Sequence, residues 1–398
     1  MLSSTLIRHP GRLAHAPVLA RSFSLPTSSS CSSTRKHRIK LVEVGPRDGL
    51  QNEKALLWTE LKVELIERLV KAGMRDVEAG SFVSPKWVPQ MATTPEVLTS
   101  PTLTALRRQH PSLSLPVLVP KARGLSSLLA HQSSHSASSS LAADDPPLTR
   151  EIAVFVSASE SFSRANLNAS IATSLENLLP VFSTAREHGL RVRAYVSVVL
   201  GCPFEGSVEP EKAAEVAKRL VEMGAYEVSL GDTVGVGVPS GWERLLNECE
   251  RNGVGVEKLA AHCHDTYGTA IANVLHCVSL GVPTIDSSIA ALGGCPYSPG
   301  ATGNVSTEDV LYALSLSGYS TSALPDPSPG ERVEDLVPPP GEEARSERQR
   351  RFEELCEVGG WVSERLGREN GSRVGRAMRG RKERERKKRE KEEGKAKL

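Results

Sequence analysis

Short apolar runs alternate with longer amphipathic segments from Ile39 onward, and this alternation constrains the fold more than any other feature. Several of the runs are nearly continuous Val, Ile, Leu and Ala, which is typical of parallel strands covered on both faces. They predict eight strands, at 39–45, 74–80, 115–120, 151–157, 191–199, 226–231, 258–263 and 284–290. Helical spacing of apolar residues is clearest between these runs at 56–72, 170–188, 211–223 and 268–280.

Strands and helices in this order predict an α/β chain folded as a (β/α)8 barrel of about 280 residues. A doubly wound sheet is the alternative. The barrel is favoured because polar, catalytic-type residues follow many different strands, whereas a doubly wound sheet binds its ligand at one crevice. No G-x-G-x-x-G follows a strand, which argues against a dinucleotide-binding fold.

The two ends of the chain are basic and the part between them is acidic. The whole chain carries +2, but residues 1–38 contain six Lys and Arg with no acid, and residues 373–398 carry a net +8. Residues 39–372 therefore carry −12, which argues against nucleic acid as a partner of the body. No stretch has the sustained apolarity of a membrane span. Seven cysteines, odd in number and irregularly spaced, indicate a reducing compartment and no disulfide scaffold.

The N-terminal segment, residues 1–38, has spaced Arg, many Ser and no acid. This composition predicts a disordered mitochondrial transit peptide, with an untargeted tail as the alternative. The catalytic barrel is expected over 39–319, with a disordered Ser-rich insertion at 131–147.

The C-terminal part divides into three expected segments. Residues 320–350 are rich in Pro and charge and predict a linker, and 351–372 predict a further helix. Residues 373–398 form a charged basic tail, either a solvated helix or disordered. The tail ends in Ala396-Lys397-Leu398, a variant of the peroxisomal S-K-L address, so a peroxisomal fraction is considered beside the mitochondrial matrix.

The ends of the first and seventh predicted strands carry the groups most suited to chemistry. Arg47 and Asp48 follow the first strand in a glycine-bounded loop, where they suit an oxyanion clamp and a ligand or base, or else a surface ion pair. The seventh strand ends in His262-Cys263-His264, and alternate residues of a strand share a face, so both imidazoles point the same way. This spacing suits a metal, and two buried, hydrogen-bonded histidines are the alternative.

Together these residues favour a divalent metal held by Asp48, His262 and His264, with an Asn or a water completing the shell. Amidohydrolases carry their H-x-H at the first strand, so its place at the seventh counts against metal-assisted hydrolysis. The remaining candidates among the histidines lack such a context and are not expected in the site: His131, His135 and His276.

A glycine-rich loop after the eighth strand, residues 293–304, offers two further groups. Its composition suits closure over a ligand. Cys295 suits a reactive thiol in an exposed loop, and Asn304 offers a side-chain oxygen.

Six motifs occur in order along the chain: VEVGPRDGLQNEK, EAGSFVSPKWVPQM, LGCPFEG, SLGDTVGVGVP, HCHDTYG and GGCPYSPGATGN. Over residues 39–318 they closely resemble the 3-hydroxy-3-methylglutaryl-CoA (HMG-CoA) lyase family. This family belongs to a metal-dependent barrel superfamily with carboxyltransferases of the pyruvate carboxylase type and the isopropylmalate and homocitrate synthases. The Cys-bearing glycine loop is the most specific motif, because the synthases lack it. The resemblance implies a retro-Claisen lyase that forms acetyl-CoA and acetoacetate in leucine breakdown and ketone-body formation.

The resemblance also implies roles for individual residues. Asp48, His262, His264 and Asn304 would bind Mg²⁺ or Mn²⁺, although ligand softness also permits Zn²⁺. Arg47 would stabilise the thioester enolate, Glu78 would orient Arg47, and His262 would take part in proton transfer. Cys295 would assist proton transfer when the loop closes, and either Asp48 or Cys295 would remove the hydroxyl proton.

An acyl-CoA substrate needs a local basic cluster on an otherwise acidic body. Lys54 and Lys86 are expected near the CoA phosphates, and Tyr195, Asp232 and Thr233 along the pocket. A homodimer is expected. Two other functions are compatible with the fold: a Claisen-type synthase or aldolase, and a non-catalytic barrel that binds a partner through its basic tail. The glycine loop argues against the first and the complete set of site residues against the second.

Overall fold

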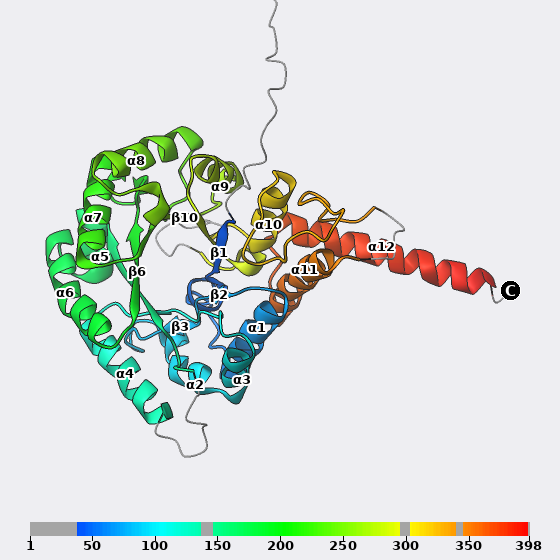
Figure 1. The fold of residues 1–398 in the computed structure, drawn as a ribbon, viewed down its shortest axis with the longest axis horizontal. Coiled ribbons are helices and arrows are strands. Elements are labelled where there is room, and N and C mark those ends of the chain that lie inside the picture. The colour runs from blue at the N-terminus through cyan, green and yellow to red at the C-terminus, as the bar shows by residue number, and fades with distance from the viewer. Residues whose placement is uncertain (1–37, 137–145, 295–302, 340–344, 397–398) are drawn as a thin grey trace, which may run out of the picture. The chain divides into compact units, whose positions relative to one another are not determined.

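The computed structural model describes residues 38–136, 146–294, 303–339 and 345–396. A curled parallel sheet stands at the centre of these residues, with helices packed around it (Figure 1). The order of its nine strands is β2-β1-β11-β10-β9-β6-β5-β4-β3. Their bounds are β1 Lys40–Glu43, β2 Asp76–Val77, β3 Gly80–Ser81, β4 Val117–Leu118, β5 Glu151–Ser157, β6 Arg191–Ser197, β9 Glu227–Asp232, β10 Leu259–Cys263 and β11 Thr284–Ser287. A short antiparallel hairpin, β7 Gly201–Cys202 and β8 Gly206–Ser207, follows β6.

The two ends of this strand order close into a barrel. β2 pairs with β1, and β3 pairs with β4, yet β2 and β3 are separated only by Glu78 and Ala79. The amide of Glu78 donates to the carbonyl of Glu43 on one side, and that of Ala79 donates to Pro116 on the other. β2 and β3 are therefore two halves of one barrel strand. The predicted (β/α)8 barrel, with each of its eight strands, is confirmed, and the doubly wound alternative is excluded.

The helices that cover the barrel bury one apolar face each. In α1, Leu65, Ile66, Leu69 and Val70 are buried at helical spacing, as the sequence predicts. The covering helices are α1 Thr59–Lys71, α2 Thr94–Thr99, α3 Pro101–Gln109, α4 Ala122–Ser136, α5 Glu160–Leu167, α6 Ile171–Glu187, α7 Pro210–Met223, α8 Pro239–Arg251, α9 Ala270–Ser279 and α10 Thr307–Leu316. Four single turns are η1 Gly45–Gly49, η2 Pro89–Met91, η3 Val256–Lys258 and η4 Ile289–Ala291. No helix in the ranges given above is both long and apolar enough to span a membrane.

The Ser-rich segment 131–147 departs from its prediction at its start. Helix α4 continues through Ser136, so residues 131–136 are helical and not disordered. Ser and His disfavour a helix interior only weakly, and the apolar first half of α4, with Leu125 and Leu128 buried, extends the helix into this segment. Residues 137–145 lie outside the described part, as does the predicted transit peptide up to residue 37.

The described residues of the predicted linker, 320–339 and 345–350, pack against the rest of the chain. Thr321 forms a bridge to Ile39 at the start of the barrel, and Leu324 and Leu336 are buried. The guanidinium of Arg348, 1% exposed, donates to the carbonyl of Pro325 and to the hydroxyl of Ser315. Residues 322–339 form no helix or strand, in keeping with prolines that remove backbone donors, but apolar residues among them still pack.

Two helices complete the described chain. α11 Glu347–Arg365 begins with a capping box at Ser346 and Gln349, earlier than the predicted 351, and buries Phe352, Leu355 and Val362. α12 Arg373–Ala396 occupies the basic tail. Of the two structures predicted for this tail, its described part adopts the helix. Ion pairs one turn apart support it, for example Arg379 with Glu383 and Arg386 with Glu390.

Candidate active site

The single turn η1 presents Arg47 and Asp48 at the end of β1. The amides of Arg47, Asp48 and Gly49 all donate to the carbonyl of Val44, which winds this turn more widely than an α-helix. A side chain at Gly49 would place its Cβ 2.8 Å from both Cβ of Leu292 and Oγ of Ser288. The glycine thus lets the turn pack directly against the segment that follows β11.

Arg47 lies between two carboxylates. Its Nε is 2.7 Å from Oε2 of Glu78, and its Nη1 is 2.7 Å from Oδ1 of Asp48. Burial alone would lower the pKa of Arg47, but the charges of Glu78 and Asp48 outweigh it and raise that pKa, so the guanidinium stays charged. Burial likewise would raise the pKa of Asp48, but Arg47 and His262 hold it below its usual value. Asp48 is therefore an ionised carboxylate.

The two histidines of β10 lie beside Asp48. Nε2 of His262 is 3.3 Å from Nε2 of His264 and 4.0 Å from Oδ2 of Asp48. Asn304, bridged to His264 through the backbone, donates from Nδ2 to Oδ2 of Asp48 at 2.9 Å and to the carbonyl of Leu292 at 3.1 Å. Residues from β1, β10 and the segment before α10 thus meet at one point.

The chemistry of these donors fits a divalent cation. One ligand atom each from Asp48, His262 and His264 lies within 4.8 Å of the others. Burial lowers the pKa of His264 to about 4, which keeps its imidazole neutral. Nδ1 of His262 lies 3.2 Å from Oδ2 of Asp286, an ionised carboxylate that can only accept, so Nε2 is the ring nitrogen that faces the candidate metal site. One anionic oxygen and the nitrogens of two imidazoles are a metal-binding donor set.

Charged residues inside the barrel support this group, and the sequence analysis missed them. Oδ2 of Asp286 is 3.2 Å from Nδ1 of His262, and its Oδ1 is 2.7 Å from Nη2 of Arg193. Arg193, 1% exposed, also pairs with Glu227 and donates to the hydroxyl of Tyr195 at 2.6 Å. Arg193 and Asp286 lie within the buried strands β6 and β11, and a charge at an inward-facing strand position is the signal that could have found them.

A family model described as HMGL-like matches residues 38–324. The chain belongs to the HMGL-like family. The resemblance read from the six motifs is thereby confirmed.

Several proteins similar to this HMGL-like chain are named as lyases. It is 46% identical over 346 residues, 86% of this chain and 97% of the relative, to a hydroxymethylglutaryl-CoA lyase of Pseudomonas mevalonii. A mitochondrial hydroxymethylglutaryl-CoA lyase of Bos taurus is 46% identical over 74% of this chain and 83% of the relative. A cytoplasmic one of Rattus norvegicus is 46% identical over 71% and 76%, respectively. The crystal structure of a hydroxymethylglutaryl-CoA lyase from Pseudomonas aeruginosa superposes with a TM-score of 0.72, 41% identity and coverage of 86% and 98%.

Three further predicted pocket residues of this HMGL-like chain, Tyr195, Asp232 and Thr233, lie in two different places. Tyr195 joins the buried network and meets the ring of His262 edge-on, with centroids 6.0 Å apart. Asp232 accepts from the amides of Val236 and Gly237, and Thr233 accepts from the amide of Val198. These last two therefore shape the loop after β9, and a hydrogen bond between the backbone of Thr233 and the ring of His264 joins this loop to the candidate metal ligands.

Lys54 and Lys86 are exposed on two loops that buried Gln90 joins. The side chain of Gln90 accepts from the amide of Leu57 at 2.9 Å and donates to the carbonyl of Ala55 at 2.8 Å. Both lysines are thus held on adjoining loops after β1 and β3. Cys295 lies outside the described residues. Nε2 of His276 lies 3.7 Å from Oε2 of Glu243, on the covering helices α9 and α8, so His276 is outside the site, as expected.

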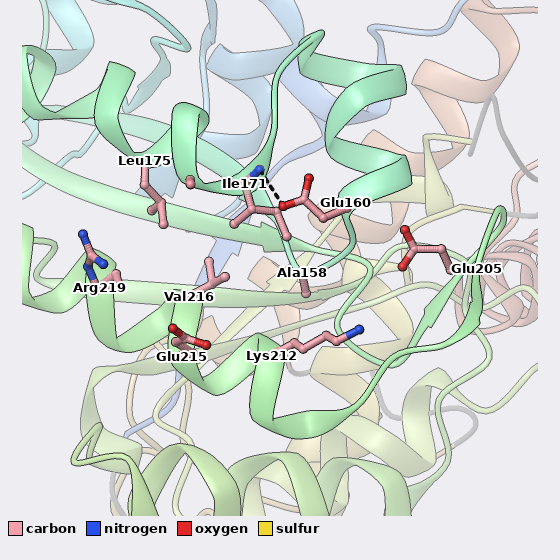
Figure 2. Close-up of a pocket in the computed structure, with 10 residues that line it drawn as sticks. Ala158, Glu160, Ile171, Leu175, Glu205, Lys212, Glu215, Val216 and Arg219 are labelled. Atoms are coloured by element: carbon pink, nitrogen blue, oxygen red, sulfur yellow. Dashed lines mark hydrogen bonds between the residues drawn. The ribbon is translucent and has the colours of Figure 1, made fainter.

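A separate cavity of about 360 Å³ lies between α5, α6 and α7 (Figure 2). Ile171, Leu175 and Val216 form its apolar floor, and Glu160 and Lys212 stand at its rim. Its lining contains three carboxylates and two basic residues, Glu160, Glu205, Glu215, Lys212 and Arg219. It includes none of the candidate metal ligands, and its surplus of acid disfavours an anionic CoA ester.

Proposed function

We propose that this protein is an HMG-CoA lyase that cleaves (S)-3-hydroxy-3-methylglutaryl-CoA to acetyl-CoA and acetoacetate. The observation that carries the proposal is the convergence of Arg47 with Asp48, His262 and His264 at one end of the barrel. Relatives named for this reaction match up to 86% of the chain. A carbon–carbon lyase of the retro-Claisen type needs a positive charge for each of its two developing anions. Arg47 is one such charge, and Asp48, His262 and His264 could hold a cation as the other.

In the reaction the C3 hydroxyl loses its proton, the C2–C3 bond breaks and its electron pair enters the thioester as an enolate. The carbonyl of acetoacetate forms at C3. A divalent cation, when bound by Asp48, His262, His264 and Asn304, supplies the positive charge that acidifies the hydroxyl. We expect Mg²⁺ or Mn²⁺, because a carboxylate and an amide oxygen join the two imidazoles.

Arg47 is the candidate for stabilising the enolate. Its guanidinium is fixed by Glu78 and Asp48, so no reorganisation is needed when charge grows on the thioester oxygen. His262 is the candidate for taking part in the proton transfer that converts the enolate carbon into the methyl group of acetyl-CoA. Asp48 and Cys295 are the two candidates for accepting the hydroxyl proton, and a Cys295→Ala variant separates them.

The cellular setting is part of the same proposal. Residues 1–38 act as a transit peptide for the mitochondrial matrix, and Ala396-Lys397-Leu398 directs a peroxisomal fraction. The catalytic unit spans 39–319, and the protein acts as a homodimer. Import into isolated mitochondria with cleavage of the first segment tests the address, and retention in the cytoplasm contradicts it.

Acetoacetate release from HMG-CoA tests the function. The protein is started at Thr34 and assayed with Mg²⁺, with EDTA and as the Arg47→Met variant. Arg123→Met is the matched control, because Arg123 is exposed on α4. We expect metal-dependent cleavage that Arg47→Met lowers by about 10²-fold or more, as for the removal of an oxyanion donor, and that Arg123→Met leaves unchanged. A folded, metal-loaded protein without cleavage contradicts the proposal, and acetyl-CoA with 2-oxo acids would then test for a synthase.

A further inference from the structure

The turn η4, directly after β11, has a strained backbone. Ala290 and Ala291 have φ of 55° and 53°, a left-handed conformation that alanine rarely adopts. Such a conformation is unfavourable for alanine and persists only where neighbouring contacts impose it. Two amides of η4 are held by buried carboxylates, since Ile289 donates to Glu43 of β1 and Ala290 donates to Glu308 of α10.

The start of α12 holds the same turn from the other side. The amide of Gly371 donates to the carbonyl of Ala290 at 3.1 Å. A Cβ at Gly371 would lie 2.8 Å from Cβ of Ala291 and 3.0 Å from the carbonyl oxygen of Ala290, so this approach requires glycine. The backbone at Gly371 therefore packs directly against η4, with no space for a side chain at this residue.

A buried hydrogen bond fixes this contact to the barrel. The hydroxyl of Ser372 donates to Oδ1 of Asp309 at 2.7 Å, and the amide of Val374 donates to the same oxygen at 2.8 Å. Ser372 is fully buried and Asp309 is 9% exposed. We name Gly371, Ser372 and their partners Ala290 and Asp309 the C-terminal latch.

The latch is connected to the candidate metal ligands by a short path. Leu292 follows η4 directly, and its carbonyl accepts from Nδ2 of Asn304, which also donates to Oδ2 of Asp48. A displacement of η4 therefore moves the acceptor that orients the Asn304 amide. Asp309 is connected to Asn304 along the chain, because it lies in the first turn of α10, five residues after Asn304.

Two ion pairs add to the latch more weakly. Nη1 of Arg373 is 3.2 Å from Oδ2 of Asp265, the residue after His264. Nη1 of Arg368 is 3.2 Å from Oε1 of Glu53, in the loop after η1. The arginine side chains are 63% and 30% exposed. Ion pairs open to solvent contribute little to stability, so the buried Ser372–Asp309 hydrogen bond and the close contact of Gly371 dominate.

We propose that Gly371 and Ser372 are positioning residues for the lyase site: they hold η4, and through Leu292 the amide of Asn304, in the geometry that the Asp48–His262–His264 group requires. Neither residue touches a reacting atom. The expected change in kcat rests on the proposed function. The expected changes in amide hydrogen exchange and in Mn²⁺ affinity rest on the structure alone.

The first test compares Gly371→Ala with Gly360→Ala in the full chain. Gly360 lies in α11 with no atom near its would-be Cβ, so its substitution is a matched control. We expect Gly371→Ala to lower kcat by about 10²-fold, the cost of a displacement near 1 Å in a catalytic group, with a much smaller change in KM. Amide hydrogen exchange should rise in peptides over 287–294, and Mn²⁺ affinity, measured by the resonance of free Mn²⁺, should fall. Gly360→Ala should change none of these.

The second test uses the buried hydrogen bond. Ser372→Ala and Asp309→Asn should each lower kcat and Mn²⁺ affinity, and the double variant should be no worse than the more affected single variant, because both remove the same contact. Arg376→Ala is the control, since Arg376 pairs with Glu369 inside the C-terminal segment.

Two results overturn the proposal: Gly371→Ala indistinguishable from Gly360→Ala, or exchange that rises over the whole chain together with a lower melting temperature. If the unaltered protein has no lyase activity, the proposed function fails. In that case the local exchange and the Mn²⁺ affinity still decide whether the latch positions the site.

Discussion

Nδ1 of His262 lies 3.2 Å from Oδ2 of Asp286, and this contact determines which ring nitrogen of His262 is free to bind a metal. Burial would raise the pKa of Asp286, but the charge of Arg193 and the hydrogen bond from His262 outweigh it and hold the pKa below its usual value. The carboxylate therefore accepts a hydrogen bond from Nδ1, which leaves Nε2, beside Asp48 and His264, as the ring nitrogen available to a metal.

The first prediction follows from this contact. Asp286→Asn should lower Mn²⁺ affinity about 10- to 100-fold, because the neutral amide no longer fixes the tautomer of His262. Ser229→Ala is the control, since it removes a hydrogen bond to the same oxygen but keeps the charge. Affinity is measured from the resonance of free Mn²⁺ on protein with a native near-ultraviolet spectrum, because Arg193 also loses a partner. Equal affinities for the two variants would contradict this role of Asp286.

The second prediction concerns the fixed orientation of Arg47. Glu78→Gln keeps the shape of the side chain but removes the charge that holds Nε of Arg47 at 2.7 Å. Arg47 then pairs with Asp48 alone, and its guanidinium turns away from the position of the enolate. We expect kcat to fall at least about tenfold, which corresponds to 1.4 kcal/mol of transition-state stabilisation. Steady-state assays measure this, with Glu64→Gln in the exposed pair on α1 as the control. An unchanged kcat would assign Glu78 a purely structural role.

The sequence predicted the strands and the main helices because their apolar residues repeat with the period of each element. Arg47, Asp48, His262 and His264 were found because each follows a strand, and the ends of parallel strands meet in a barrel. Arg193 and Asp286 were not found, since a charge inside a strand is a signal only once the strand is known to be buried on that side. The packing of 320–339 was missed because Pro and charge obscure the few residues, such as Leu336, that are buried.

The third prediction concerns the two exposed lysines on the adjoining loops after β1 and β3. Lys54→Ala and Lys86→Ala should raise KM for HMG-CoA with little change in kcat, because each removes a charge that attracts the CoA phosphates before and during the reaction. The effect should shrink as ionic strength rises, since exposed charges are screened beyond about 10 Å at 0.1 M salt. Lys218→Ala, also exposed but on α7, is the control. A KM that does not change at low salt would place the nucleotide elsewhere.

The five cysteines in the described part of the chain are buried and free. Burial raises the pKa of Cys249 to about 12 and raises that of Cys263 well above its usual value, so neither is a thiolate at neutral pH. The fourth prediction is that a thiol reagent modifies the folded protein at no more than Cys31 and Cys295. Peptide mass mapping after brief labelling locates the sites, and a Cys295→Ser variant gives the background. Modification of Cys263 in folded protein would contradict the burial of that strand.

The last prediction concerns Glu308, whose carboxyl group is buried between η4 and α11. Burial raises its pKa from 4.5 to about 8, with Asp309 and Glu43 as nearby acids that raise it further. Between pH 4.5 and about pH 8, Glu308 is therefore protonated in the folded protein and ionised in the unfolded chain. The stability gained from this proton is complete below pH 4.5 and is lost as pH rises through about 8. The slope is at most about 1.4 kcal/mol per pH unit for one proton.

Glu308→Gln cannot ionise, so its free energy of unfolding should fall less steeply than that of the unaltered protein between pH 6 and pH 9. Urea midpoints across this interval measure the difference. Glu369→Gln, at a side chain that is 81% exposed, is the control and should follow the unaltered protein. Parallel curves for the unaltered protein and Glu308→Gln would show that Glu308 is ionised in the folded state. The contact of its Oε2 with the amide of Ala290 would then be a charged one, and η4 would be held more strongly than a neutral acid allows.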